Sequence, residues 1–216
     1  LRALDLPAAQ EAEDTRAVAA ATVYPWSVSS LAQADAAFHP YHESPEHYPK
    51  DAAYHNGAIW TWLTGPLVSL MAEQGAADKA YEQTQYLTHL ALDRWGIGTI
   101  PENSDALPKP GQAEVRLTGT VSQAWSLAEY LRNAYEDYAG VTYVRPDFVR
   151  LAPHLPAAWG GAVRVRFRVG DGLVTALIRQ GKDTGTDGEV VEATLDAGPG
   201  VTDDATVELV AAGGVK

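Results

Sequence analysis

Four prolines in residues 24–57 restrict the possible folds of this chain more than any other feature. Pro25, Pro40, Pro45 and Pro49 lie in a stretch that is also rich in Tyr and His. Proline lacks a backbone N–H and clashes with the preceding helical turn, so no long helix can run through this stretch. Long loops are uncommon in compact domains unless they have a function. We therefore expect a functional loop here.

The segments after this loop predict first helices and then strands. Residues 162–169 alternate strictly between Val or Phe and Arg, which predicts a strand with one buried face. Of the 19 aromatic residues, only Phe167 lies beyond residue 160, so the end of the chain differs in kind from its beginning. Apolar spacing and composition predict helices over 8–21, 58–74, 76–93 and 121–138.

The order of these elements predicts the fold class. Helices joined by long irregular loops are typical of an α/α toroid, in which the loops gather at one end. The helices are too few to close such a ring, so this interpretation expects further helices upstream. We predict a mainly α fold, the C-terminal part of a toroid followed by a small antiparallel β segment. The expected domains are residues 1–160, with the active-site loops, and residues 161–216, a β-strand appendage.

Composition excludes several classes of function. The chain has 16 Lys and Arg against 28 Asp and Glu, a net charge of -12, which argues against nucleic-acid binding and suits a neutral ligand. The absence of cysteine excludes disulfides and thiolate zinc sites. No apolar run reaches the ~18–20 residues of a membrane-spanning helix, so we expect no membrane association. We expect a cytoplasmic protein, although the start of the chain at Leu1 gives no information about its localisation.

The first candidate motif is the loop of residues 54–60. His55 and Asn56 precede a predicted helix and offer both hydrogen-bond donors and acceptors, and Trp60 adds a flat apolar ring. Sugars need this combination, because their hydroxyls form hydrogen bonds while their C–H faces lie on aromatic rings. The alternative is that His55 and Asn56 cap the helix and Trp60 belongs to the core.

Two further loops have a similar make-up. In residues 96–105, Glu102 follows a rigid proline and could act as a general base toward water. The alternative for Glu102 is an exposed turn residue. In residues 119–129, Gln123 and Trp125 lie near the start of a helix, with a core position as the alternative for Trp125. The recurrence of polar groups beside aromatic rings at three junctions favours a sugar site.

Three segments together resemble a known family. YPKDAAYHNGAIWTWLTGP, WGIGTIPENSD and GTVSQAWSLAEYLR, in this order and spacing, look like the C-terminal half of the glucosidase domain of glycogen-debranching enzymes. These amylo-α-1,6-glucosidases have an (α/α)6 toroid. The resemblance covers about residues 24–160 and implies an inverting glycoside hydrolase that removes an α-1,6-linked glucose from an α-glucan or oligosaccharide, without a cofactor.

The resemblance also implies roles for residues. The Glu of the family's G-x-x-P-E loop is the general base, which matches Glu102, and the family's general acid is an Asp well upstream of the matched segments. Local carboxyls are weaker candidates for the acid, so we expect the missing upstream toroid half to supply it and the isolated chain to be nearly inactive. These weaker candidates are Glu43, Glu46, Asp51 and Asp105. The expected substrate-binding residues are Tyr54, His55, Asn56, Trp60, Asp105, Gln123 and Trp125.

Other functions remain open at this point. A non-catalytic carbohydrate-binding or structural module would have the same aromatic and polar residues, and a trehalase-like or mannosyl hydrolase would have a related fold. A phosphorylase would need a cationic phosphate site. The cations that these loops offer are Lys50, Arg94, Lys109 and Arg116.

A metal site is a further alternative. It would use His39, His42 and His47, but their irregular spacing in a proline-rich loop is more typical of surface histidines, so we expect no metal.

Overall fold

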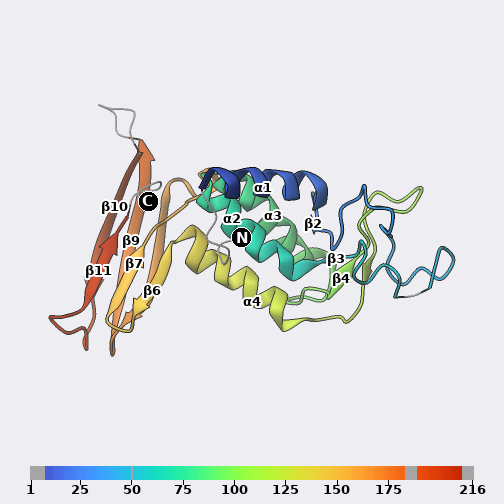
Figure 1. Ribbon diagram of the computed structural model, residues 1–216. Coiled ribbons are helices and arrows are strands. Elements are labelled where there is room, and N and C mark those ends of the chain that lie inside the picture. The colour runs from blue at the N-terminus through green and yellow to red at the C-terminus, as the bar shows by residue number, and fades with distance from the viewer. Residues whose placement is uncertain (1–7, 50, 183–188, 211–216) are drawn as a thin grey trace. The chain divides into compact units, whose positions relative to one another are not determined.

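The computed structural model describes residues 8–49, 51–182 and 189–210 (Figure 1). Lys50 and the parts of the expected β appendage at 183–188 and 211–216 lie outside these described residues. Two π-helical turns, Leu90–Arg94 and Asn133–Tyr138, follow α3 and α4 directly. The α-helices are α1 (Ala8–Thr22), α2 (Thr64–Glu73), α3 (Ala77–His89) and α4 (Ala124–Arg132).

The strands fall into four sheets within the described ranges, with the orders β1-β2, β3-β4-β5, β11-β7-β6 and β10-β9-β8. The short strands of the first half are β1 (Val23–Tyr24), β2 (Ser27–Val28), β3 (Ile59–Trp60), β4 (Asn103–Ser104) and β5 (Leu117–Thr118). The later strands are β6 (Val141–Arg145), β7 (Phe148–Leu151), β8 (Ala162–Val169), β9 (Gly172–Lys182), β10 (Glu189–Ala197) and β11 (Thr206–Leu209).

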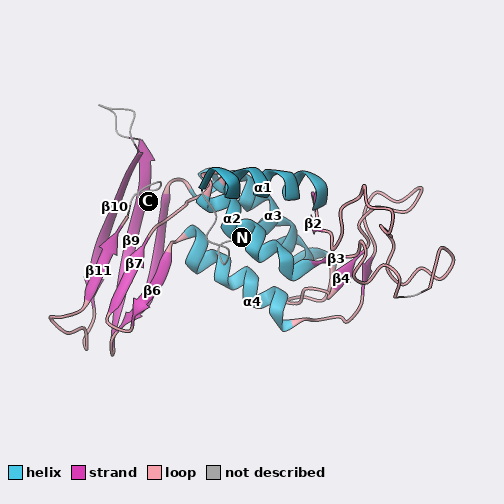
Figure 2. Cartoon of the chain, in the orientation of Figure 1, coloured by secondary structure: helices cyan, strands magenta, loops and turns pink. Residues whose placement is uncertain are grey.

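The predicted mainly α toroid is wrong. Helices make up 32% of the structure and strands 26%, with four sheets and four helices in the part of the chain that is described (Figure 2). The prediction took the segments between helices for irregular loops. Short pieces of these segments instead pair with one another, because backbone N–H and C=O groups that leave water need partners. The fold therefore mixes helices and sheets.

The helix predicted over 58–74 begins later than expected. Ile59 and Trp60 form β3, and α2 starts only at Thr64. Pro66 lies in the first turn of α2, where its missing N–H has no intrahelical acceptor to lose. The predicted end is confirmed, since Gly75 follows α2 with a φ of +77°, a left-handed conformation that favours glycine.

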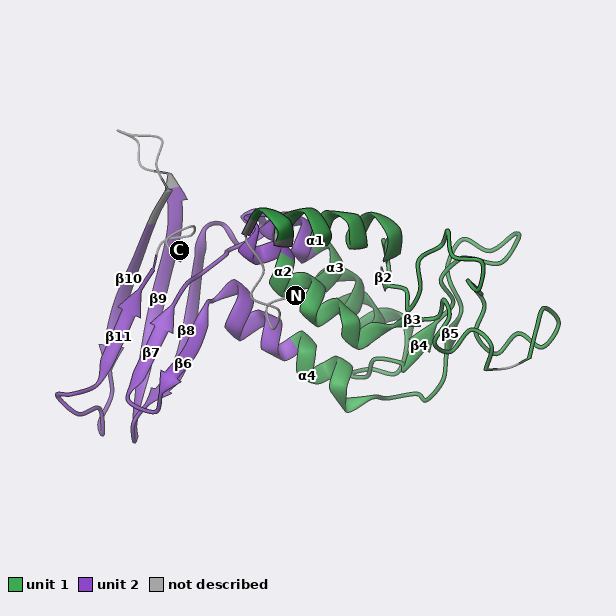
Figure 3. Cartoon of the chain, in the orientation of Figure 1, with its two compact units in different colours: residues 1–70, 82–130 green, residues 71–81, 131–216 purple. Residues whose placement is uncertain are grey.

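The chain divides into two compact units (Figure 3). The first unit consists of Leu1–Leu70 and Glu82–Tyr130, and the second of Met71–Tyr81 and Leu131–Lys216. The first contains the sheet β3-β4-β5 and all the residues predicted to bind sugar. The domain boundary predicted at residue 160 stays a prediction.

The second unit confirms the strand alternation predicted for residues 162–169. In β8, Val165, Phe167 and Val169 are buried while the arginines between them are exposed. Val169 pairs with Gly172, which leaves a two-residue turn between β8 and β9. The antiparallel prediction does not hold throughout, because β11 pairs parallel with β7.

A small apolar cluster in the first unit anchors the loop that carries Glu102. Leu87, Leu90 and Ile100 are almost completely inaccessible to solvent and pack together. Leu117 of β5 packs against the same cluster. Because Ile100 lies two residues before Glu102, this packing fixes where the loop leaves the core.

Candidate functional site

The sheet β3-β4-β5 brings the three predicted loops together. Trp60 in β3 pairs with Asn103 in β4, and Asn103 pairs with Thr118 in β5. The Glu102 N–H donates to the Thr120 carbonyl oxygen at 3.0 Å, and the Gln123 N–H donates to that of Ile100 at 3.1 Å. One backbone ladder therefore connects the three segments that the sequence singled out.

Glu102 is held by two hydrogen bonds from different loops. The Tyr54 hydroxyl donates to Oε1 at 2.5 Å, and the Thr120 backbone N–H donates to Oε2 at 2.9 Å. Only 7% of Glu102 is exposed, so the alternative of an exposed turn residue is wrong. Gly119 has a φ of +74°, and a Cβ there would lie 2.8 Å from Oε2. A glycine before Thr120 therefore makes room for the carboxylate.

These contacts favour the ionised form of Glu102. Burial by itself raises the pKa of this carboxyl, but hydrogen bonds from Tyr54 and from Thr120 and Gln123 outweigh it and hold the pKa below its usual value. The pKa of Tyr54, which donates to Glu102, shifts in the opposite direction. The hydrogen bond to Glu102, together with burial, raises the pKa of Tyr54 to about 12, so Tyr54 remains a donor at neutral pH.

Aromatic rings lie next to this carboxylate. The Tyr54 and Trp60 ring centroids are 4.6 Å apart, and the His55 ring stacks on Trp60 at 5.5 Å with an angle of 8° between the planes. Trp125 lies 6.1 Å from Trp60 and is 44% exposed, so it is not a core residue. The structure therefore brings together the aromatic residues predicted to line a sugar pocket.

The two predicted amide side chains hold local positions. Asn56 is exposed, and its Nδ2 donates to the Ala52 carbonyl oxygen at 3.0 Å. Gln123 Nε2 donates to Thr120 Oγ1 at 2.6 Å, beside the backbone N–H that binds Glu102. Gln123 therefore belongs to the surroundings of Glu102, whereas Asn56 supports the turn that carries Tyr54.

Asp105, three positions after Glu102, has hydrogen-bond partners of its own. Asp105 is 0% exposed, its Oδ1 accepts the His42 backbone N–H at 2.8 Å, and Oδ2 lies 3.5 Å from Arg116 Nε. Burial raises the pKa of Asp105 against the opposing effect of Arg116. Its predicted contact with sugar stays a prediction.

Sequence reasoning missed the partners of these carboxyls. It did not connect Tyr54 with Glu102, which lie 48 positions apart, or Arg116 with Asp105. Arg116 Nη2 also donates to the carbonyl oxygens of His42 and Glu43. The presence of Arg116 in the same loop as Asp105 indicates an ion pair between them only weakly. The glycine at 119 was the stronger signal, because glycine permits a close approach.

Glu46 and the three histidines of the alternative metal site have contacts of their own. Glu46 accepts a hydrogen bond from Lys109, which lowers the pKa of Glu46 to about 2. His39 stacks on Tyr48 at 4.5 Å, and His42 is buried. Within the described residues, no group of three or more His, Cys, Asp or Glu side chains is placed to hold a metal ion. The described helices also include none that is long and apolar enough to cross a membrane.

Comparison with known proteins identifies one family. A family model described as amylo-alpha-1,6-glucosidase matches residues 3–132. This span covers every residue of the cluster around Glu102. The cluster consists of Tyr54, His55, Trp60, Glu102, Thr120, Gln123 and Trp125. The search of curated proteins found no match to this chain.

Proposed function

Because the chain belongs to the amylo-alpha-1,6-glucosidase family, we propose that Glu102 is the general base of an inverting hydrolysis of α-linked glucose. One observation carries the proposal. A buried carboxylate, kept ionised by hydrogen bonds from Tyr54 and Thr120, lies where three loops meet beside aromatic rings. An ionised carboxylate is what a general base requires.

Glu102 has the capacity to take a proton from water. A carboxylate offers about four lone-pair positions, and the Tyr54 hydroxyl and the Thr120 backbone N–H occupy one on each oxygen. The side chains of Thr120 and Gln123 also stabilise the charge, to a smaller extent, and a water molecule that approached Glu102 would take the place of one of these contacts. A water molecule bound in this place would donate to Glu102 while its oxygen forms a bond to the anomeric carbon. The glycosidic C–O bond breaks on the opposite face, and the leaving oxygen takes a proton from the general acid.

The aromatic rings give the sugar a surface to bind. Trp125 is exposed and lies close to Trp60, which has His55 stacked on it. Apolar C–H faces of a glucose unit would pack on the exposed rings of Trp125 and His55, while Trp60, only 9% exposed, supports these rings from the core. Gln123 would offer its amide oxygen to a hydroxyl. A net charge of -12 suits an uncharged glucan better than an anionic substrate.

We propose that the general acid comes from outside this cluster. An acid must be protonated and lie about 6.5–9.5 Å from the base across the sugar. Glu46 is ionised by its contact with Lys109, and Asp105 is fully buried. Asp51 is exposed and close enough to Tyr54 to raise the pKa of its hydroxyl, so it is the local candidate that an experiment should test.

A substrate that needs no acid separates the two roles. Fluoride leaves α-glucosyl fluoride without protonation, so its hydrolysis requires the base alone. We expect the chain to release fluoride and β-glucose, and we expect Glu102→Gln to slow the reaction by about 10²–10⁴-fold. Glu13→Gln, at an exposed position in α1, serves as the matched control and should keep the rate.

The outcomes decide between hydrolysis and binding. An unchanged rate in Glu102→Gln would remove Glu102 from the reaction. If maltoheptaose binds but glucosyl fluoride is not hydrolysed, the chain is a carbohydrate-binding module instead. If the chain also cleaves an α-1,6-linked glucoside and Asp51→Asn abolishes only that cleavage, the acid lies at Asp51, and our assignment of the acid to a residue outside the cluster is wrong.

A further inference from the structure

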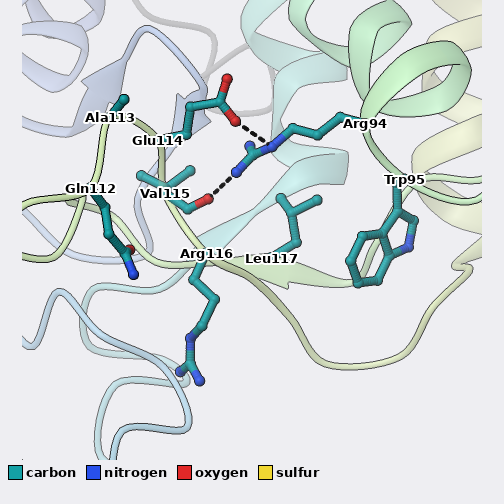
Figure 4. A pocket seen from close by; sticks show the side chains of 8 residues that line it. All are labelled: Arg94, Trp95, Gln112, Ala113, Glu114, Val115, Arg116 and Leu117. Atoms are coloured by element: carbon teal, nitrogen blue, oxygen red, sulfur yellow. Dashed lines mark hydrogen bonds and ion pairs between the residues drawn. The ribbon is translucent and has the colours of Figure 1, made fainter.

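A hollow lies in the first unit, lined by residues other than the seven predicted to bind sugar. It is a shallow depression, open to solvent, with a volume of about 590 Å³. Figure 4 shows the side chains around it, which come from the end of the π-helical turn after α3 and from the segment that leads into β5. Those that matter for the argument are Arg94, Trp95, Gln112, Glu114 and Arg116.

The planar groups around this hollow are fixed by their own contacts. Arg94 Nε lies 2.6 Å from Glu114 Oε2, and the same guanidinium donates to the Val115 carbonyl oxygen (Figure 4). It also donates to the Tyr86 hydroxyl at 3.2 Å. The Trp95 indole N–H donates to the Val121 carbonyl oxygen at 2.6 Å. A ligand that binds here would meet groups that are already oriented, which reduces the entropy lost on binding.

The charges of the hollow are balanced. Arg94 pairs with Glu114, and Arg116 lies beside the buried carboxyl of Asp105 and donates to carbonyl oxygens of the neighbouring loop. A phosphate site needs cations whose charge is not already matched. The two arginines that a phosphorylase could have used therefore do not form an anion site here, and the hollow suits a neutral polar ligand.

We propose that this hollow is a second binding site for a neutral α-glucan chain, separate from the cluster around Glu102. The indole of Trp95 offers an apolar face to a sugar ring, and the exposed side chains of Gln112 and Glu114 offer an amide and a carboxylate to its hydroxyls. The identity of the sugar as an α-glucan rests on the proposed function. The existence of the site rests on the geometry of the hollow.

Indole N–H signals in a ¹H–¹⁵N NMR titration with maltoheptaose distinguish the two sites. Trp95 reports on the hollow, while Trp60 and Trp125 report on the cluster around Glu102. Trp159 packs against Tyr138 in the second unit and serves as the reference. We expect maltoheptaose to shift the signals of Trp95, Trp60 and Trp125 and to leave that of Trp159 unchanged. Inorganic phosphate should shift none of them.

Substitutions at the hollow test the contacts directly. Gln112→Ala removes one hydrogen-bonding group from an exposed side chain, and we expect about fivefold weaker binding in the Trp95 titration, the effect of one neutral hydrogen bond. Gln74→Ala, at an exposed position after α2, is the matched control and should not change it. Trp95→Ala and Trp95→Phe lack this indole signal, so the side-chain amide signal of Gln112 reports on the hollow in them. Trp95→Ala should abolish its shift with maltoheptaose, whereas Trp95→Phe should retain part of it because a ring remains.

The outcomes of the titration distinguish the second binding site from the proposed function of the cluster around Glu102. Shifts confined to Trp60 and Trp125 would overturn the second site and leave the proposed function standing. Shifts confined to Trp95, weakened by Gln112→Ala, would support the hollow and count against sugar binding at the Glu102 cluster. A Trp95 signal that responds to phosphate instead of maltoheptaose would show an anion site and overturn the inference, and a titration that moves no indole signal would overturn both sites.

Discussion

Replacing Tyr54 with phenylalanine tests whether Glu102 is held as an anion. The substitution keeps the aromatic ring that packs against Trp60 but removes the hydroxyl that donates to Oε1 at 2.5 Å. Glu102 then keeps its hydrogen bond from the Thr120 backbone N–H. We expect the pKa of Glu102 to rise in Tyr54→Phe, because burial still disfavours the charge and one group that stabilised it is gone.

The loss of stability should depend on pH. A hydrogen bond to a charged group contributes about 1.5–3 kcal/mol, and one between neutral groups about 0.5–1.5 kcal/mol. The pKa of Glu102 is lower in the folded than in the unfolded chain, so this stabilisation is present above the unfolded pKa and is lost as the pH falls through the folded pKa. We expect Tyr54→Phe to lower the free energy of unfolding by about 2 kcal/mol at neutral pH and by about 1 kcal/mol once Glu102 is protonated.

Urea unfolding, followed by tryptophan fluorescence from about pH 7 to about pH 2, measures this difference. Tyr24→Phe is the matched control in the same unit, because the Tyr24 hydroxyl donates to the neutral amide oxygen of Gln33 at 3.4 Å. Its loss of stability should be small and independent of pH. A loss in Tyr54→Phe that is equally large across the whole pH range would refute the conclusion that Tyr54 stabilises a charged Glu102.

Three further substitutions test the structure around the site and the second unit. Gly119→Ala should lower the free energy of unfolding by about 2 kcal/mol, because it adds a Cβ at a positive φ, 2.8 Å from Glu102 Oε2; a urea midpoint equal to that of the wild type would contradict this. Arg116→Met should lower it by about 2–3 kcal/mol, because it leaves the buried carboxylate of Asp105 without its cation, and Asp105→Asn in the same chain should recover part of the loss in a double-mutant cycle. Phe167→Ala should lower it by about 3–5 kcal/mol through the cavity it leaves in the core of the second unit, and differential scanning calorimetry should show a clear fall in the unfolding temperature of that unit.

Local sequence patterns identified the segments of the candidate site but not the contacts between them. The Pro-Glu sequence at 101–102 and the aromatic residues near Trp60 and Trp125 indicated which segments would matter, and the structure brings these segments together. Their contacts could not be predicted, because the strands that join them are two residues long and have no periodic signal of their own. The roles of the individual residues in sugar binding stay predictions.

Asp105 is a second residue whose contacts could not be predicted from the sequence. From the sequence, Asp105 is expected to bind substrate and is a weaker candidate for the general acid. Glu102 and Asp105 flank the two-residue strand β4. Asp105 forms a buried contact with His42 and Arg116, while other residues hold Glu102. The hydrogen-bond partners of Asp105 therefore depend on distant segments, and its predicted contact with sugar stays a prediction.

Those parts of the fold that depend on residues close together in the chain could be predicted from the sequence alone. The Val and Arg alternation fixed which face of β8 is buried, the prolines of residues 24–57 excluded a long helix, and glycine at 75 ended α2. The tertiary structure decided what depends on distant segments: the mixed fold in place of a toroid, and the hydrogen bond between Tyr54 and Glu102. Local sequence patterns show which side chains of a segment are buried and which face solvent. The pairing of remote segments depends on the path of the whole chain between them, which no local pattern contains.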